Sequence, residues 1–402
     1  MLRVLRTAFR GDGSEHGAWA FVCNGVHCPT SSTHRHIYMS ASASLKPGNA
    51  FLTATRNMLF DCGGITPAAK VLVVREAPGL GYYADDLAPA LQDACRSLGL
   101  HADLTTAPFE PEAVELPPRL VREMASYDMT VFLARIGDQV RFIALPEGAR
   151  AIVSYALSIE AMCSSFGTTP YEYFVELKDL LEAAIADANI HITCPHGTSI
   201  TGLADAGPQA GGEVSIRRFP LLVPRPVLAA RFSGKASLCG FLVGTGNSYY
   251  DHYGIQFEQS LKAHFENGEM SHFEGHAADV ARANQHYDRI SRHFGVERNY
   301  VHSWHAGIHP ACTYEGKAAD NFEAWSGSAF GNPRLLHFHT CGKQPPGEIS
   351  WNIVDPTIAA DGVVLWENGR LRPDNLPEGQ ALLKRSPDLA QLFAAPGQAI
   401  GV

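Results

Sequence analysis

Histidines are concentrated in one short interval of this 402-residue sequence. The stretch VHSWHAGIHPACTY at residues 301–314 contains three of them, and HFH follows at 337–339. Neutral imidazoles are the most common ligands of zinc and non-haem iron, and two or three of them with one carboxylate leave coordination positions open. The interval therefore offers the ligands of a metal site. Its histidines are His302, His305, His309, His337 and His339.

The spacing of these histidines matches no fixed ligand pattern. HExxH is absent, and a histidine in a loop often only forms a hydrogen bond. Residues 337–339 are typical of a strand, in which His337 and His339 point to one face and Phe338 to the other. Spacing alone leaves both metal binding and ordinary hydrogen bonding open.

Two further polar stretches can contribute to a site. In GEISWNIVDPTI, residues 347–358, Asp355 can serve as a metal ligand or general base, although Asp-Pro is also an ordinary turn signal. The loop GTGNSYYDHYG at 244–254 presents Tyr249, Tyr250 and His252 for hydrogen bonds to a substrate. We expect both stretches to contribute to the same site as the histidines.

Other kinds of active site lack their signature motifs. The glycines of the loop at 244–254 do not follow the dinucleotide fingerprint, and neither a GxxxxGK[ST] phosphate loop nor a GxSxG nucleophile elbow occurs. The nine cysteines are scattered without a CxxC pair, which argues against a disulfide framework or a thiolate zinc site. Cys312 and Cys341 flank the histidine interval, but a scattered cysteine is more often a small buried residue than a nucleophile.

The elements that must position these residues are predicted from hydrophobic periodicity. In the first part of the chain, apolar runs typical of strands are separated by amphipathic helical patterns. We predict strands at 70–76, 129–136, 149–156 and 189–195, and helices at 84–100 and 171–188. Strands separated by helices indicate a mainly parallel sheet covered on both faces, which is an α/β domain.

The pattern changes after GTSITG at 197–202. Strand-like alternation with turns follows, including a turn at 265–268, a helix at 276–295 and a hairpin at 362–371 with Asn368-Gly369 at its tip. These features predict a β-rich α+β domain. We expect a disordered N-terminal extension (1–50), the α/β domain (51–205) and the β-rich domain carrying the cleft (206–402).

The composition is that of a globular protein, with 46% hydrophobic residues. The formal net charge of -9 and the lack of a basic run argue against binding to nucleic acid or an anionic membrane. No window holds the roughly 18 apolar residues of a membrane span, and the N-terminus lacks the apolar region of a secretory signal. We therefore expect a cytoplasmic protein with a small-molecule or peptide partner.

Taken in order, several short motifs resemble those of the M29 aminopeptidases and 2,5-dihydroxypyridine 5,6-dioxygenases. They are RNMLFDCGGITPAAKVLVV, GTSITG, FENGEMSHFEG, AGIHPACTY and VVLWENGRL, and they extend over roughly residues 52–370. The resemblance implies a two-domain metalloprotein fold, usually a homodimer, with the site on the C-terminal domain near the cleft.

The ligands that this resemblance implies are altered in the present chain. Four residues before the glycine of AGIHP, where the family has a glutamate or histidine, stands Ser303, between His302 and His305. An aminopeptidase histidine corresponds to Phe338. Because strand geometry turns the neighbours of Phe338 to the opposite face, we expect His337 and His339 to face away from a site that Phe338 would face.

The family's His-x-Asp pair before the last hairpin is also altered. Counting without a gap places it at Asp355 and Thr357, and allowing a gap places it at Ser350 and Asn352. Neither alternative gives His-x-Asp.

Two interpretations follow. In the first, the site is rebuilt from His302 or His305, His337 or His339, and Asp355, as a mononuclear iron(II) or zinc centre with open positions. In the second, the metal is lost, and the cleft binds a peptide or small molecule of a biosynthetic pathway without catalysis.

As an enzyme, the chain is expected to act on a small aromatic compound or short peptide by ring modification, cyclisation or hydrolysis, in catabolism or biosynthetic tailoring. His305 would move protons and Asp355 would orient it. The expected substrate contacts are Tyr249, Tyr250, His252, Ser303 and His309. Ordinary aminopeptidase activity is the least favoured, because the two-metal ligand set is absent.

Overall fold

Three β-sheets form the framework of the protein. The computed structural model describes residues 48–205, 214–344 and 346–402. Almost all of the N-terminal extension expected to be disordered lies outside the described residues. The last two positions of the expected range, Asn49 and Ala50, begin helix α1 (Asn49–Arg56).

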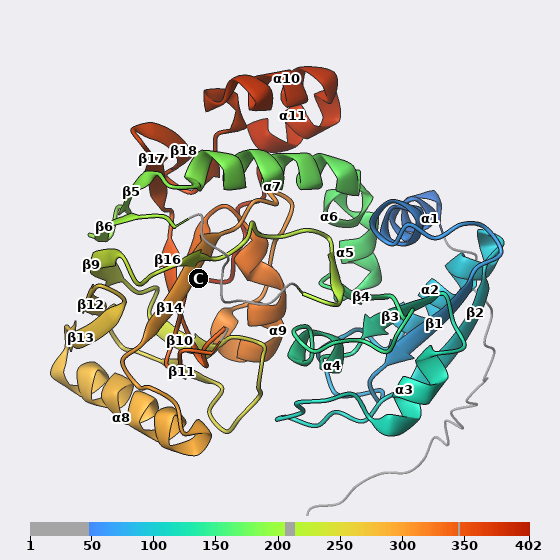
Figure 1. The fold of residues 1–402 in the computed structure, drawn as a ribbon, viewed down its shortest axis with the longest axis horizontal. Helices are drawn as coiled ribbons and strands as arrows, with labels where there is room; N and C mark the ends of the chain where they lie inside the picture. The colour runs from blue at the N-terminus through green and yellow to red at the C-terminus, as the bar shows by residue number, and fades with distance from the viewer. Residues whose placement is uncertain (1–47, 206–213, 345) are drawn as a thin grey trace, which may run out of the picture. The chain divides into compact units, whose positions relative to one another are not determined.

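The first sheet is parallel and has the strand order β2-β1-β3-β4-β7. Its strands are β1 (Lys70–Arg75), β2 (His101–Thr106), β3 (Met129–Leu133), β4 (Ala151–Ser154) and β7 (Arg217–Phe219). The helices α2 (Leu87–Ser97), α3 (Pro118–Met124) and α4 (Ile136–Gln139) accompany it (Figure 1). All five residues of β3 are buried, as expected for a central parallel strand covered on both faces. The predicted parallel sheet is confirmed.

The second sheet is antiparallel, with the order β11-β10-β16-β15-β14-β8. Its strands are β8 (Val227–Leu228), β10 (Phe241–Gly244), β11 (Gly254–Gln256), β14 (Val301–Ala306), β15 (Leu335–Thr340) and β16 (Ile349–Val354). Every residue of β14 and β15 is buried. The histidine stretch at 301–306, for which we predicted no strand, is therefore an interior strand.

The third sheet is antiparallel, with the order β13-β12-β9-β6-β5-β17-β18-β19. Its strands are β5 (Asn189–Thr193), β6 (Ser199–Leu203), β9 (Phe232–Ser237), β12 (Lys262–Glu266), β13 (Glu269–Glu274), β17 (Thr357–Ala360), β18 (Val363–Glu367) and β19 (Arg370–Leu371). The sequence pattern predicts that β5 joins the parallel sheet, and this prediction is wrong, because β5 pairs with β6 and β17 in antiparallel register. The chain returns to the parallel sheet only at β7.

The two predicted hairpin tips are confirmed, since β12 pairs with β13 and β18 with β19. Asn267 and Gly268 have φ of 48° and 75°, and Asn368 and Gly369 have 46° and 75°. Two successive residues with positive φ are what a type I′ turn requires, and Asn-Gly adopts this conformation most readily.

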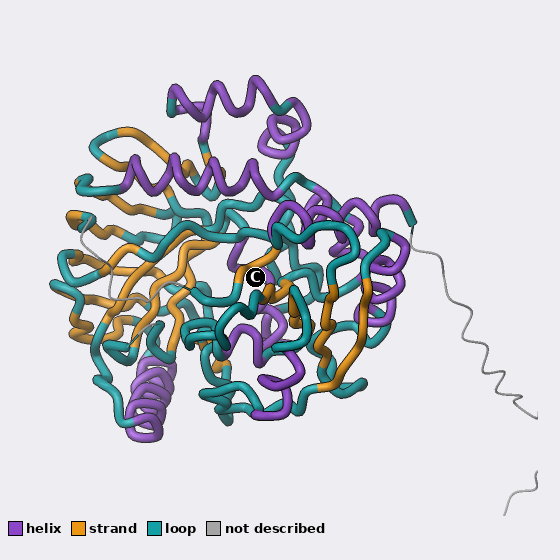
Figure 2. Tube along the Cα trace, turned by 45° about the vertical axis from the view of Figure 1, so that its right-hand side comes forward, coloured by secondary structure: helices purple, strands orange, loops and turns teal. Residues whose placement is uncertain are grey.

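Large aromatic side chains pack between the antiparallel sheets and form the core behind the histidines. Phe338 is fully buried, and its ring lies 5.6 Å from that of Phe265 and 5.9 Å from that of Trp351. Trp304 belongs to the same core. Figure 2 shows these strands in orange, with helices around them.

The remaining helices cover the sheets or close the chain (Figure 1). They are α5 (Ile159–Cys163), α6 (Ser165–Thr168), α7 (Tyr171–Ile185), α8 (Ala277–Phe294), α9 (Phe322–Ser328), α10 (Pro377–Arg385) and α11 (Pro387–Ala394). The predicted helices at 84–100, 171–188 and 276–295 correspond to α2, α7 and α8. No helix in the described part of the chain has the length and apolar character needed to cross a lipid bilayer.

Candidate metal centre

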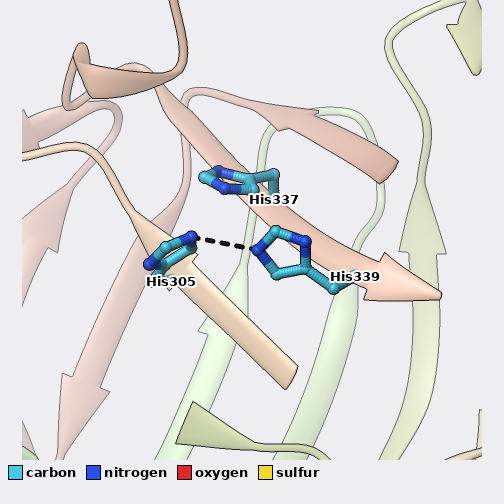
Figure 3. Close-up of side chains that lie close together, drawn as sticks. All are labelled: His305, His337 and His339. Atoms are coloured by element: carbon cyan, nitrogen blue, oxygen red, sulfur yellow. Dashed lines mark hydrogen bonds between the residues drawn. The ribbon is translucent and has the colours of Figure 1, made fainter. Parts of the chain in front are cut away.

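Three histidines on two neighbouring strands meet on one face of the six-stranded sheet. His305 on β14 lies opposite His337 on β15, and His339 lies two residues further along β15. Residues two apart in a strand share a face, so all three rings point the same way. The nitrogen atoms that they offer lie within 4.8 Å of one another, and all three residues are buried (Figure 3). We call these residues the histidine triad.

The ring of His305 is held at both nitrogens. Its Nδ1 lies 3.1 Å from the carbonyl oxygen of Pro224, to which it donates a hydrogen bond, and its Nε2 lies 3.1 Å from Nε2 of His339 (Figure 3). Donation from Nδ1 leaves a lone pair on Nε2, directed at the other two rings. Metal-binding histidines are commonly oriented in this way, by a hydrogen bond from the second ring nitrogen to a carbonyl group.

The triad is electrically neutral at pH 7. Burial lowers the pKa of His305 to about 3. Burial also holds the pKa of His337 and of His339 well below its ordinary value, and the charges of neighbouring groups lower both further. Neutral imidazole is the form that coordinates a metal, so no proton has to leave before binding.

The separation of His305 and His339 matches that of two ligands of one metal ion. Two nitrogens that are each about 2.1 Å from the same ion lie about 3.0 Å apart at a right angle and about 3.4 Å apart at a tetrahedral angle. The separation of 3.1 Å between the Nε2 atoms of His305 and His339 falls between these values. The Nδ1 atoms of His337 and His339 have no hydrogen-bond partner among the described residues. His305 and His339 therefore fit a divalent ion of the zinc or iron(II) type, and a nitrogen of His337 lies within 4.8 Å of both.

A cavity of about 640 Å³ opens over the histidine face of the sheet. Ser350 and Asn352 on β16 lie opposite His339 and His337, and both line this cavity. Nδ2 of Asn352 has no acceptor among the described residues. The sheet thus presents hydroxyl and amide groups beside the triad.

His302 and Ser303 complete the part of the lining that β14 provides. The register between β14 and β15 shifts between Val301 and Ser303, and such a bulge turns an additional side chain toward the same face. Nδ1 of His302 lies 2.8 Å from the Ser303 hydroxyl oxygen. Burial lowers the pKa of His302, but His302 is not part of the triad.

The parallel-sheet half of the chain supplies another wall of the cavity. The Tyr155 hydroxyl donates a 2.6 Å hydrogen bond to one carboxylate oxygen of Asp138, and the other lies 3.4 Å from the Arg141 guanidinium. Burial and the Asp138 charge raise the pKa of Tyr155 above its ordinary value, so the phenol stays protonated. Arg218 on β7 and Phe330 also line the cavity. We had predicted none of these five residues, because no local motif marks them.

The expectation that the site would lie on the face of Phe338 was wrong. Phe338 packs in the core, and the cavity lies on the face of His337 and His339. Ser303, which stands where the resemblance implies a ligand, lines the cavity. Ser350 and Asn352, the positions of the implied His-x-Asp pair when a gap is allowed, line it as well.

The structure does not bring Asp355 to the histidines. This residue lies in the turn after β16, where its carboxylate accepts hydrogen bonds of 2.6 Å and 2.8 Å from the guanidinium of Arg334. Its φ of 52° is that of a turn residue, so the turn interpretation of Asp-Pro holds here. Within the described residues, the candidate metal group contains three histidines and no carboxylate.

The predicted contacts in the loop at 244–254 do not line the cavity either. The Tyr250 hydroxyl donates to the carbonyl oxygen of Glu348 over 2.7 Å. The ring of Tyr249 stacks on that of Tyr253 with centroids 5.0 Å apart, and His252 is exposed with a φ of 55°. The two tyrosines thus stabilise the loop.

His309 is a buried packing residue. Its ring stacks on Phe174 with centroids 4.0 Å apart and meets the ring of Phe166 edge-on. Burial lowers its pKa to about 3. Of the five predicted substrate contacts, only Ser303 lines the cavity.

Two solved structures match most of this chain. That of 2,5-dihydroxypyridine dioxygenase from Pseudomonas putida KT2440 has 14% sequence identity and a TM-score of 0.54, and the match covers 83% of this chain and 99% of that chain. AmpT from Thermus thermophilus has 12% identity and a TM-score of 0.46, over 80% of this chain and 98% of that chain. No protein-family model and no curated protein sequence matches the chain. The likeness to the dioxygenase shows a shared fold, and it confirms the resemblance that the order of the motifs predicted.

Proposed function

We propose that this chain is a metal-dependent enzyme in which His305, His337 and His339 hold one divalent ion, and that it carries out an oxygen-dependent reaction on an aromatic compound. The observation that carries the proposal is the triad itself, three neutral imidazoles within reach of one ion and open to a cavity. The fold shared with a dioxygenase supports the reaction class, at the level of analogy.

His305, His337 and His339 would hold the ion by three of its coordination positions, and the remaining positions would be free for water or substrate. A bound divalent ion supplies Lewis-acid chemistry, and iron(II) in addition supplies the one-electron chemistry that molecular oxygen requires. The sheet holds the three rings in place, and the Pro224 carbonyl group fixes the orientation of His305.

Tyr155 and Asp138 are placed to move a proton. The phenol donates its own proton to Asp138, so its oxygen can accept a hydrogen bond from a hydroxyl group in the cavity. A substrate proton can then pass to Tyr155 while the phenol proton passes to Asp138, which is general-base catalysis through a hydroxyl group. Phe330 lies edge-on to Tyr155 and His337, with centroids 5.8 Å and 5.2 Å away, and provides an apolar surface for an aromatic ring.

A metal-free binding protein is the second candidate, and one observation favours it. His305 and His339 are joined by a hydrogen bond between their Nε2 atoms, so two of the three rings have a partner without an ion. In this state His339 carries the proton on Nε2 and His305 accepts it.

Metal analysis distinguishes the two candidates. The protein is purified without a histidine tag, reconstituted without oxygen with iron(II) or with zinc, and desalted before the metal is measured by mass spectrometry. We expect one equivalent of metal per chain in the wild type and loss of the metal in His305→Ala. The control is His264→Ala, which removes a histidine on β12 outside the cavity and should keep one equivalent. Oxygen uptake is then measured with a panel of hydroxylated pyridines and benzenes. A wild-type protein that retains no metal, and whose ligand binding is unchanged by chelators, would be a binding protein.

A further inference from the structure

Two guanidinium groups share the cavity with the histidine triad. We infer that Arg218 and Arg141 form a carboxylate-binding subsite, so that the substrate is an organic acid larger than a single aromatic ring. The inference rests on the proposed function in one respect, since it places the subsite beside a metal centre. The contact between a guanidinium group and a carboxylate itself requires no metal.

Arg218 provides the available cation. It lies on the edge strand β7, is half-buried and lines the cavity. Within the described residues, its guanidinium makes no ion pair with a carboxylate. Arg218 lines the same cavity as all three residues of the triad. A half-buried guanidinium without a carboxylate partner favours an anionic ligand, since desolvation weakens its interaction with water.

Arg141 provides a second set of donors. Its side chain is 7% exposed, and one terminal nitrogen donates to the Asp138 carbonyl oxygen over 2.6 Å, which fixes the direction of the guanidinium. A guanidinium has five N–H donors, so the bonds to Asp138 and Gly246 leave others for a ligand. Arg141 lines the same cavity as His305 and His339.

The charge of the lining supports an anionic ligand although the whole chain is acidic. Five cationic side chains and two carboxylates line the cavity, whereas the chain has a formal net charge of -9. Glu182 lies 3.3 Å from the Lys178 ammonium and 3.6 Å from the Arg225 guanidinium, so these two cations share one partner. A positive surface of this kind attracts anions and raises their local concentration.

The two arginines of the subsite and Asp138 leave one positive charge for a negative group on the ligand. Arg141 is paired with Asp138, whereas Arg218 has no carboxylate partner among the described residues, so one positive charge is left over. A carboxylate carries one negative charge and accepts two parallel hydrogen bonds from one guanidinium. A phosphate monoester carries more charge than this subsite balances.

A single aromatic ring would leave much of the cavity unfilled. A cavity of about 150 Å³ is enough for benzene, whereas this one measures about 640 Å³. With a ring against Phe330 and Tyr155 and a carboxylate at Arg218, room remains for further atoms. The cavity therefore fits an aromatic acid with a side chain, or a short peptide-like acid that carries an aromatic group.

The test measures calorimetric binding of 3-phenylpropanoate, its neutral amide and phenyl phosphate to the full chain, with metal and after chelation. We expect the acid to bind at least about tenfold more tightly than the amide, as a charge-assisted bidentate contact predicts. Arg218→Gln should abolish this preference, and Arg218→Lys should keep part of it because the charge remains. The matched control is Arg370→Gln, which makes the same change on β19 outside the cavity. Circular dichroism and thermal unfolding check that each variant is folded.

Each outcome decides a separate point. Loss of the preference in Arg218→Gln, with the metal content unchanged, supports the subsite. Equal binding of acid and amide by the wild type, no binding of the acid, or an unchanged preference in Arg218→Gln overturns it, and tighter binding of phenyl phosphate overturns the carboxylate assignment. The metal content of the same samples tests the proposed function independently. If the wild type retains no metal after reconstitution but still prefers the acid to the amide, the metal centre is refuted and the carboxylate subsite stands.

Discussion

The Nε2 atoms of His305 and His339 lie 3.1 Å apart on neighbouring interior strands of one sheet. Without a metal ion the contact is a hydrogen bond between two neutral rings, and the same two atoms would be the ones to hold an ion. Binding would then require the proton of His339 to move to its other ring nitrogen, because Nε2 carries it in the hydrogen bond.

Metal binding should raise the thermal stability of the protein through the triad. A ligand present at one hundred times its dissociation constant stabilises the folded state by about 2.7 kcal/mol, which raises the melting temperature by a few degrees. We expect this rise with zinc in the wild type and in His302→Gln, and its loss in His339→Gln. Differential scanning fluorimetry with and without a chelator measures it, and an equal rise in His339→Gln would exclude the triad as the site.

Adjacent residues of β15 should differ sharply in their contribution to stability. Phe338 fills the core between the antiparallel sheets, so Phe338→Ala should lower the free energy of unfolding by about 3–5 kcal/mol. His337 faces the cavity, so His337→Ala should lower it by about 1 kcal/mol or less in metal-free protein. Urea denaturation of both variants tests which face is core, and equal losses would contradict the assignment.

Glu348 should make stability depend on pH. Burial raises the pKa of this carboxyl to about 7 from its ordinary 4.5, and Oε2 has no partner among the described residues. The folded chain therefore keeps a proton that the unfolded chain loses above pH 4.5. Since the folded state binds more protons in this range, the free energy of unfolding falls as pH rises from about 4.5 to 7, by up to about 3 kcal/mol.

Glu348→Gln removes this titration. We expect the variant to gain stability relative to the wild type as pH rises, with the difference levelling off above about pH 8. Urea denaturation of both proteins from pH 5 to 8.5 measures this difference. A constant difference across the range would mean that the carboxyl does not titrate there.

Asp355 should be structural. Asparagine tolerates the positive φ of this residue, so Asp355→Asn removes the charge with little strain. We expect a loss of about 1 kcal/mol from the ion pair with Arg334, and a metal content equal to that of the wild type. Arg334→Gln should show a similar loss. A drop in metal content in Asp355→Asn, but not in Arg334→Gln, would show that Asp355 belongs to the metal site.

Local patterns were sufficient to predict many of the elements. Alternation identified β15 and the shared face of His337 and His339, and Asn-Gly marked both hairpin tips. These features depend on a few consecutive residues, and so periodicity and turn chemistry describe them well.

Pairing between distant segments could not be predicted in this way. β5 has the sequence of a strand in either kind of sheet, and only its partners β6 and β17 decide which sheet it joins. Asp355 is a carboxylate close to the histidines in the sequence. The register instead places Asn352 beside His337, and β16 ends at Val354, so Asp355 lies in the turn that follows. Arg218 reaches the cavity only because β7 returns to the edge of the parallel sheet.

The setting of the triad in the sheet has a consequence for metal selectivity. β14 and β15 are interior strands, each hydrogen-bonded to a neighbour on both sides, so their separation is set by the ladder and not by the ion. The rings can rotate, but the Cα atoms that carry them cannot spread without breaking backbone hydrogen bonds. In the proposed metal centre such a rigid frame would discriminate by ionic radius: we expect an ion with longer metal–nitrogen bonds to be held less tightly than zinc or iron(II), whatever its intrinsic affinity for imidazole.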